Sequence, residues 1–189
     1  MPKGKAIRAT ILKRSITLTK VILTVAIAGL TCAAGLFAAS KPVTVDLKNA
    51  KGESVGSATL SEKAGSGVTI KLNLKNLPAG EHAAHIHGVA KCEAPGFTTA
   101  GPHFNPDKKH HGLQNPEGPH AGDMPNFTVK ANGTAKATLT DPRVNMGDGD
   151  HSVFTGGGTA LVIHAKADDM KSDPAGNAGD RIACGTITK

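Results

Sequence analysis

Apolar and polar residues alternate along several stretches of the chain after residue 40, and this alternation restricts the available folds more than any other feature. Residues 67–74 carry an apolar side chain at every second position, and residues 43–47 repeat the pattern. Side chains on a β-strand point to opposite faces in turn, so each stretch predicts a half-buried strand. No ten-residue stretch after residue 40 shows a helical period. The chain is therefore predicted to be all-β, a sandwich or a barrel.

Further strands are predicted toward the C-terminus. Residues 127–130 and 135–140 flank Asn132-Gly133, a dipeptide that favours a tight turn because both of its residues tolerate a positive φ. We expect a β-hairpin here, followed by strands over residues 160–165 and 182–188. Residues 88–125 and 167–180 lack the alternation and are predicted to be loops. Long loops in a compact domain usually carry function.

The first 40 residues have the composition of a secretory signal peptide. Six of the 22 basic residues lie in the first twenty positions, no acidic residue precedes Asp46, and residues 21–39 are apolar or small. Together with the small residues Ala38-Ala39-Ser40, this pattern predicts cleavage after Ser40 and a mature domain of residues 41–189. The protein is then exported, to the periplasm or outside the cell.

Two alternatives concern this N-terminal segment. Residues 21–39 could remain as a membrane anchor, since about 20 apolar residues span a bilayer. Cys32 could carry a lipid, although Gly29-Leu30-Thr31 lacks the residues that such a site prefers. Cleavage instead removes Cys32 and leaves Cys92 and Cys184, and an even cysteine count in an exported domain predicts one disulfide.

The mature domain shows no sign of a nucleic-acid partner. The net charge of +7 belongs to the leader, because the remaining 16 basic residues nearly balance the 15 acidic ones. Aromatic residues make up only 3% of the chain, with no Trp and no Tyr. This composition excludes a protein that stacks bases on aromatic side chains.

Nine histidines stand in the chain, all of them after residue 40. His85 and His87 flank Ile86 on a predicted strand, so both imidazoles project from one face while Ile86 enters the core. His164 ends the apolar run 160–163 and faces outward by the same alternation. His82 lies three residues before His85 and faces the other way, so we expect a structural, hydrogen-bonded histidine there.

The long loop adds three imidazoles and a carboxylate, a four-ligand set of the kind that tetrahedral zinc prefers. These residues are His103, His111, His120 and Asp123. Each one alone fits a solvated loop residue. Together with the pair on the strand, they predict a metal centre.

Five motifs, in this order along the chain, resemble those of copper/zinc superoxide dismutase. They are Gly80-Glu-His-Ala-Ala-His-Ile-His, Gly101-Pro-His-Phe-Asn-Pro, His120-Ala-Gly-Asp123, His164-Ala-Lys-Ala-Asp-Asp and Gly176-Asn-Ala-Gly-Asp-Arg-Ile-Ala-Cys-Gly. The resemblance spans about residues 43–187. It implies an immunoglobulin-like Greek-key barrel or sandwich of about eight antiparallel strands with long metal-binding and electrostatic loops.

The resemblance also implies a set of site residues. Copper would be held by His85, His87, His103 and His164, and zinc by His103, His111, His120 and Asp123, with His103 bridging the two ions. His110 is a rival to His111, but the spacing of nine residues between His111 and His120 fits the family's loop better. Asp168 matches the carboxylate that joins a copper histidine to a zinc histidine. Arg181 matches the arginine beside the copper, and Cys92 and Cys184 match the family disulfide.

The activity implied by the resemblance is conversion of superoxide to O2 and hydrogen peroxide while copper cycles between Cu(II) and Cu(I). Each subunit would hold one copper and one structural zinc, with Arg181 attracting the superoxide anion and His103 handling a proton. The resemblance allows a homodimer and implies no stable membrane association after cleavage. Two rivals are a copper-binding module without turnover and a structural β-sandwich whose histidines decorate its surface.

The sequence departs from the family pattern next to the strand histidines. Ala83 and Ala84 stand where the family usually has Gly and an aromatic residue. Ala84 is predicted to point inward, so the core there is either smaller or filled from elsewhere. Residues 112–119 and 122–125 resemble the bacterial, exported members of the family.

Overall fold

The computed structural model describes Met1, residues 41–62 and residues 65–189. The predicted signal peptide, its cleavage point and Cys32 lie outside these residues. In this described part of the chain, no helix is long and apolar enough to cross a membrane.

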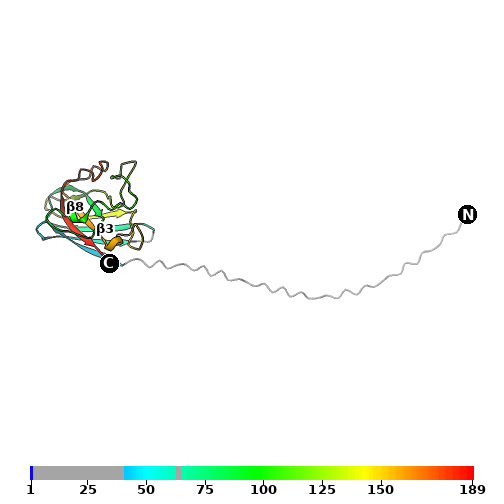
Figure 1. Cartoon of the computed structure of the whole chain (residues 1–189), viewed down its shortest axis with the longest axis horizontal. Helices are drawn as coiled ribbons and strands as arrows, with labels where there is room; N and C mark the ends of the chain where they lie inside the picture. Colours follow the sequence, from blue (N-terminus) through cyan, green and yellow to red (C-terminus); the bar gives the residue numbers. More distant parts are fainter. Residues whose placement is uncertain (2–40, 63–64) are drawn as a thin grey trace. The chain divides into compact units, whose positions relative to one another are not determined.

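Regular structure in the described residues consists of β-strands and two short 3-10 helices, with no α-helix, which confirms the all-β prediction (Figure 1). The strands are β1 (Val43–Asn49), β2 (Ser54–Glu62), β3 (Val68–Leu74), β4 (Gly80–His82), β5 (Ala84–His87), β6 (Phe127–Val129), β7 (Ala135–Asp141), β8 (Thr159–His164) and β9 (Arg181–Ile187). The 3-10 helices are η1 (Thr98–Ala100) and η2 (Thr155–Gly157).

The strands form one large antiparallel sheet and one small one. The large sheet has seven strands in the order β5-β8-β9-β1-β2-β3-β7, and β4 pairs with β6. Only Ala83 separates β4 from β5, so the chain passes from the small sheet into the large one at this residue. Strand β3 lies beside β7 although β4, β5 and β6 come between them in the chain, which is a Greek-key connection.

The predicted alternation decides which side chains form the core. On β3, Val68, Ile70, Leu72 and Leu74 are buried in the main core, and Ile86 joins them from β5. Ala84 is also fully buried in this core, as its inward orientation predicted.

Strand β8 is buried on both of its faces. Leu161 and Ile163 enter the main core, whereas Ala160 and Val162 pack with Phe97 and its neighbours in a second, smaller cluster. By the alternation along the strand, His164 lies on the same face as Ala160 and Val162, so its side chain points away from the main core.

The predicted hairpin over residues 127–140 is wrong in its strand pairing. The turn forms, because the Lys130 N–H donates to the Thr134 carbonyl at 2.8 Å and the Gly133 N–H to the Lys130 carbonyl at 2.9 Å. Beyond the turn the strands separate: β6 pairs with β4 and β7 pairs with β3. The Asn-Gly turn therefore joins the two sheets.

Candidate metal centre

Seven buried side chains form two groups of ligand atoms that share one histidine. In each group, the ligand atoms lie within 4.8 Å of one another. The first group is His85, His87, His103 and His164, and the second is His103, His111, His120 and Asp123.

Two paired strands supply most of the first group. Strands β5 and β8 are antiparallel neighbours, with His85 opposite Val162, so their histidines share one face of the sheet. The long loop then runs beside β5. The backbone of His103 pairs with that of His87, and the backbone of Asp123 pairs with that of His85, each as an isolated antiparallel β-bridge. The sheet thus brings loop residues against the strand pair.

Backbone carbonyls fix the orientation of two of these rings. His87 Nδ1 donates to the Gly101 carbonyl at 2.8 Å, and His164 Nδ1 to the Gly179 carbonyl at 3.2 Å. Their Nε2 atoms therefore face each other, 3.4 Å apart. A hydrogen bond on one ring nitrogen directs the other toward a metal.

Asp123 is the centre of the second group. Its Oδ1 lies 2.9 Å from His103 Nδ1, 3.0 Å from His111 Nδ1 and 3.4 Å from His120 Nδ1. Its Oδ2 accepts the backbone N–H groups of Gly112 at 2.9 Å and His120 at 3.0 Å. One carboxylate oxygen thus faces three imidazoles while the other is held by the loop backbone.

Asp168 joins the two groups from the second predicted loop. Its Oδ2 lies 2.9 Å from His85 Nε2 and 3.0 Å from His111 Nε2. Both nitrogens donate to this buried carboxylate, so Asp168 orients one ring of each group.

Two buried imidazole nitrogens without a polar partner indicate where a metal ion fits. Among the described residues, the buried side-chain atoms without a hydrogen-bond partner are His85 Nδ1, His103 Nε2, His111 Nδ1 and Asp141 Oδ2. His111 Nδ1 lies 3.0 Å from Asp123 Oδ1, so it has a polar contact. His85 Nδ1 and His103 Nε2 have none, and each lies on the ring edge opposite a carboxylate contact. Buried imidazole nitrogens without a partner are costly unless a ligand completes them, so this donor set fits a metal ion.

The electrostatics of the metal-free site keep most of the imidazoles neutral. Burial lowers the pKa of His87 to about 2 and the pKa values of His103 and His164 to about 4. Burial likewise lowers the pKa of His85. Neutral imidazole is the form that binds metal, so these rings need not lose a proton on binding.

Asp123 and His111 are both held in their charged forms. Burial raises the pKa of Asp123, but hydrogen bonds from His103, His111 and His120 outweigh it and hold the pKa far below its usual range. Burial lowers the pKa of His111, but the neighbouring carboxylates of Asp123 and Asp168 outweigh it and raise the pKa to about 9.

Arg181 lines the cavity that leads to the shared histidine. This cavity, of about 960 Å³, is also lined by His103, His120 and His164 and by the exposed Lys108 and Lys109. Burial lowers the pKa of Arg181, which nevertheless stays cationic at neutral pH. The cavity therefore offers positive charge to a small anion.

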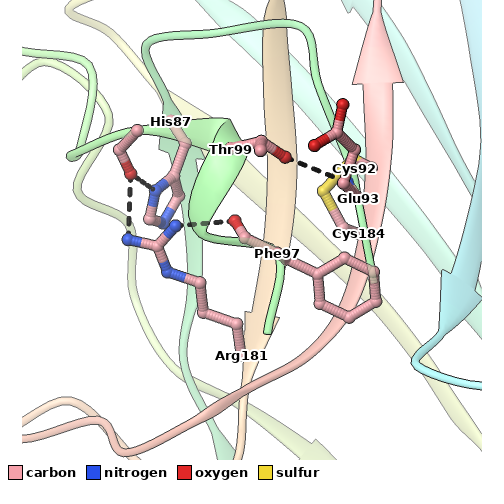
Figure 2. The surroundings of a disulfide bond; sticks show 8 residues. His87, Cys92, Glu93, Phe97, Thr99, Arg181 and Cys184 are labelled. Atoms are coloured by element: carbon pink, nitrogen blue, oxygen red, sulfur yellow. Dashed lines mark hydrogen bonds between the residues drawn. A yellow bond between two sulfur atoms is a disulfide. The ribbon is translucent and has the colours of Figure 1, made fainter. Parts of the chain in front are cut away.

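Figure 2 shows how the disulfide segment holds this arginine. Cys92 and Cys184 form a disulfide, as the sequence predicted. Arg181 Nη1 donates to the Phe97 carbonyl at 2.8 Å and Nη2 to the Gly101 carbonyl at 2.9 Å. The Gly101 carbonyl also accepts from His87, so one loop orients both the arginine and a strand histidine.

Three histidines lie outside both groups, namely His82, His110 and His151. The side chain of His110 is 54% exposed at the cavity rim, whereas that of neighbouring His111 is fully buried. The predicted structural role of His82 is confirmed, because its Nδ1 and Nε2 lie 2.8 Å and 2.9 Å from the carbonyls of His164 and Pro78.

Sequence reasoning missed two side chains that hold the site from outside. Arg143 contacts the backbone of His120 and Asp123, and Asn126 contacts the backbone of Asp168. Neither has a ligand-type side chain, and neither falls in a recurring motif, so the chain offers no local signal for its role.

Sequence comparison matches this chain to one protein family. A family model for copper/zinc superoxide dismutase matches residues 54–187. A relative from Aquifex aeolicus, superoxide dismutase [Cu-Zn] 1, is 54% identical over 144 residues, which cover 75% of this chain and 85% of the relative.

Solved structures agree with these sequence matches. The copper/zinc superoxide dismutase of Brucella abortus superposes with a TM-score of 0.63 at 30% identity, covering 78% of this chain and 99% of that one. A superoxide-dismutase-like protein from Bacillus subtilis gives a TM-score of 0.74 at 36% identity, covering 76% and 97%. These matches confirm the fold class predicted from the sequence.

Proposed function

Because this chain belongs to the copper/zinc superoxide dismutase family, we propose that its two ligand groups divide the two metals between them. The four-histidine group, His85, His87, His103 and His164, holds copper, and the second group, His103, His111, His120 and Asp123, holds zinc. Soft and borderline metals such as copper suit an all-imidazole set, whereas three imidazoles and a carboxylate suit tetrahedral zinc. The protein is a superoxide dismutase that forms O2 and hydrogen peroxide.

The observation that carries the proposal is the position of His103. Its Nδ1 lies 2.9 Å from Asp123 Oδ1 in the zinc group, while its Nε2 is unpartnered and faces the copper group. A single imidazole can therefore serve both ions, one on each nitrogen.

Copper, when bound, supplies the one-electron redox chemistry that dismutation requires. Arg181 attracts the anionic substrate and, with its guanidinium fixed by two carbonyls, presents its charge inside the cavity. The neutral His103 ring has a single proton, so Nε2 would carry it when Nδ1 serves zinc and Nε2 is not bound to copper. His103 lines the cavity, so its ring would supply one of the two protons of the hydrogen peroxide product.

Two variants test the division between the metals. His164→Ala removes a ligand of the copper group only, so it should abolish dismutation while zinc stays bound. Asp123→Ala should lose bound zinc before it loses copper, because this carboxylate belongs to the second group alone. Metal content and the rate of superoxide decay would be measured for each purified variant.

The outcomes separate the proposal from its rival. If His164→Ala keeps wild-type activity, or if Asp123→Ala loses copper and keeps zinc, the assignment is wrong. If the wild-type protein retains copper yet does not consume superoxide, it is a copper-binding module of the same fold.

We propose further that the protein is exported and acts in the periplasm or outside the cell. The basic and apolar N-terminal segment and the cysteine pair support this location. Mass spectrometry of the exported protein should find its N-terminus within a few residues of Lys41. An intact Met1, or a lipidated Cys32 as the first residue, would contradict cleavage near Lys41. A separate measurement, sedimentation of the mature protein, would distinguish a homodimer from a monomer.

A further inference from the structure

One guanidinium spans the turn that carries two of the proposed zinc ligands. Arg143 Nε donates to the carbonyl of His120 at 3.2 Å, and Arg143 Nη2 donates to the carbonyl of Asp123. The Asp123 N–H lies 3.4 Å from the His120 carbonyl, so these two residues are the ends of a tight turn. Arg143 therefore contacts both ends of the turn at once.

Arg143 is itself held by its near neighbour Asp141 and by His151. Asp141 is fully buried, and its Oδ1 lies 2.8 Å from Arg143 Nη2 and 3.0 Å from the Arg143 backbone N–H. His151 Nδ1 donates to the Arg143 carbonyl at 2.8 Å, and His151 Nε2 lies 3.1 Å from Asp107 in the metal-binding loop. The Asp141 carboxylate thus holds the guanidinium, and Asp141 and His151 hold the backbone of Arg143.

The inner side of the same turn is held by the strand of the copper ligands. The Ile86 N–H donates to the Gly122 carbonyl at 2.9 Å, and the Gly122 N–H donates to the Phe104 carbonyl at 2.9 Å. A Cβ at Gly122 would lie 2.2 Å from the Ile86 carbonyl oxygen, so the turn packs directly against β5. Strand β5 supports one side of the turn, and Arg143 supports the other.

We propose that Arg143 is a positioning residue for the zinc site, which rests on the proposed function above. By holding the His120 and Asp123 carbonyls together, it fixes the direction in which the His120 imidazole and the Asp123 carboxylate face the ion. A planar, forked cation reaches two carbonyls, whereas the ammonium of lysine is a single point of contact. Outer contacts of this kind typically change metal affinity by about 10-fold to 100-fold.

The test compares Arg143→Gln and Arg143→Lys with the wild-type protein and with Lys136→Gln, a control at an exposed position on β7. Zinc affinity is measured by chelator competition on folded protein, copper affinity in the same way, and the geometry of the site by the visible spectrum of Co(II) bound in place of zinc. Arg143→Lys keeps a cation beside Asp141 and serves as the variant that folds if Arg143→Gln does not.

We expect Arg143→Gln to bind zinc at least about tenfold more weakly, with a changed Co(II) spectrum and with copper affinity within about twofold of wild type. Arg143→Lys should lie between the two, and Lys136→Gln should match wild type. Unchanged zinc affinity and an unchanged Co(II) spectrum in either Arg143 variant would overturn the inference, even if thermal stability falls. Failure of the wild-type protein to bind zinc would instead overturn the zinc assignment, and this inference with it.

Discussion

Asn126 and Asp168 are hydrogen-bonded in both directions through one side-chain amide. Asn126 Nδ2 donates to the Asp168 carbonyl at 2.9 Å, and Asn126 Oδ1 accepts the Asp168 backbone N–H at 2.9 Å. The carboxylate of Asp168 contacts His85 and His111, one from each ligand group. The amide therefore fixes the backbone of the residue that links the copper and zinc groups.

Asn126→Ala should weaken the binding of both metals, because it releases the backbone of Asp168 and lets the His85 and His111 rings rotate. We expect a loss of about tenfold in affinity for each ion, the lower range for contacts outside the ligand set. Competition with chelators measures it, and Asn132→Ala, in an exposed turn, is the matched control. A variant that binds both ions as wild type does would show that the Asp168 backbone needs no such support.

The stability of the metal-free protein should fall as the pH rises from about 6.5 to about 9. His111 has an ordinary pKa of 6.5, and the carboxylates of Asp123 and Asp168, outweighing burial, raise it to about 9 in the fold. The folded state therefore holds a proton that the unfolded state has lost, and this stabilisation is complete below pH 6.5. Its loss amounts to at most about 3–4 kcal/mol, since one pKa unit corresponds to about 1.4 kcal/mol.

Denaturant unfolding of the metal-free protein at pH 6 and pH 9 checks this prediction. His111→Gln has no imidazole to titrate at this position, so its free energy of unfolding should vary less over the same range. Equal pH dependence in the two proteins would assign the effect to another group.

Arg181→Ala should keep both metals and react more slowly with superoxide at low salt, by about tenfold, because the attraction of the anion is lost. Arg181→Lys keeps the charge and should retain the fall in rate with rising ionic strength. Rates for both variants at two ionic strengths, alongside metal content, provide the measurement. Arg181→Ala with the same salt dependence as wild type would assign the steering to Lys108 and Lys109 instead.

Cys184→Ser should lower the free energy of unfolding by up to about 4.6 kcal/mol, the chain-entropy value for a loop of this length. The disulfide joins residues 92 positions apart and anchors the segment whose carbonyls hold Arg181 and His87. Thermal melting and copper retention would both decrease. Unchanged melting together with unchanged copper retention would mean that the loop is held without the covalent link.

Local alternation predicted the strands whose partners bury one face evenly, such as residues 43–49 and 68–74. Strand β2 was not predicted, because the alternation of buried and exposed residues shifts by one position within it. Leu47 pairs with Gly56 and Lys48 with Ser54, which leaves Val55 as a bulge, so Val55 and Ala58 are both buried although three positions apart.

Pairing between distant strands could not be read from the chain. The Asn132-Gly133 turn is a local event, but β7 pairs with β3 over seven residues, Val68–Leu74 against Ala135–Asp141. That longer register outweighs the pairing of β6 with β7 that the turn alone favours. The sequence predicted the reversal of the chain and not its partner.

In the candidate site, the ligand residues could be predicted from the sequence, but the residues that support them could not. Imidazole spacing on the strand and in the loop, together with the ordered motifs, pointed to all seven residues of the two ligand groups. Arg143 and Asn126 act through backbone carbonyls and amides, whose positions depend on the whole fold. No residue type or spacing marks such contacts in advance.

The disulfide between Cys92 and Cys184 also closes the chain that carries the ligand-bearing loops into a covalent ring. Every proposed ligand except His85 and His87 lies between Cys92 and Cys184. A protease that cuts once in this interval, for instance after the exposed Lys109, opens a ring and releases no fragment. The two pieces would migrate apart only after reduction, so the enzyme can be cut once in this exposed loop and still keep its ligands on one covalently connected molecule.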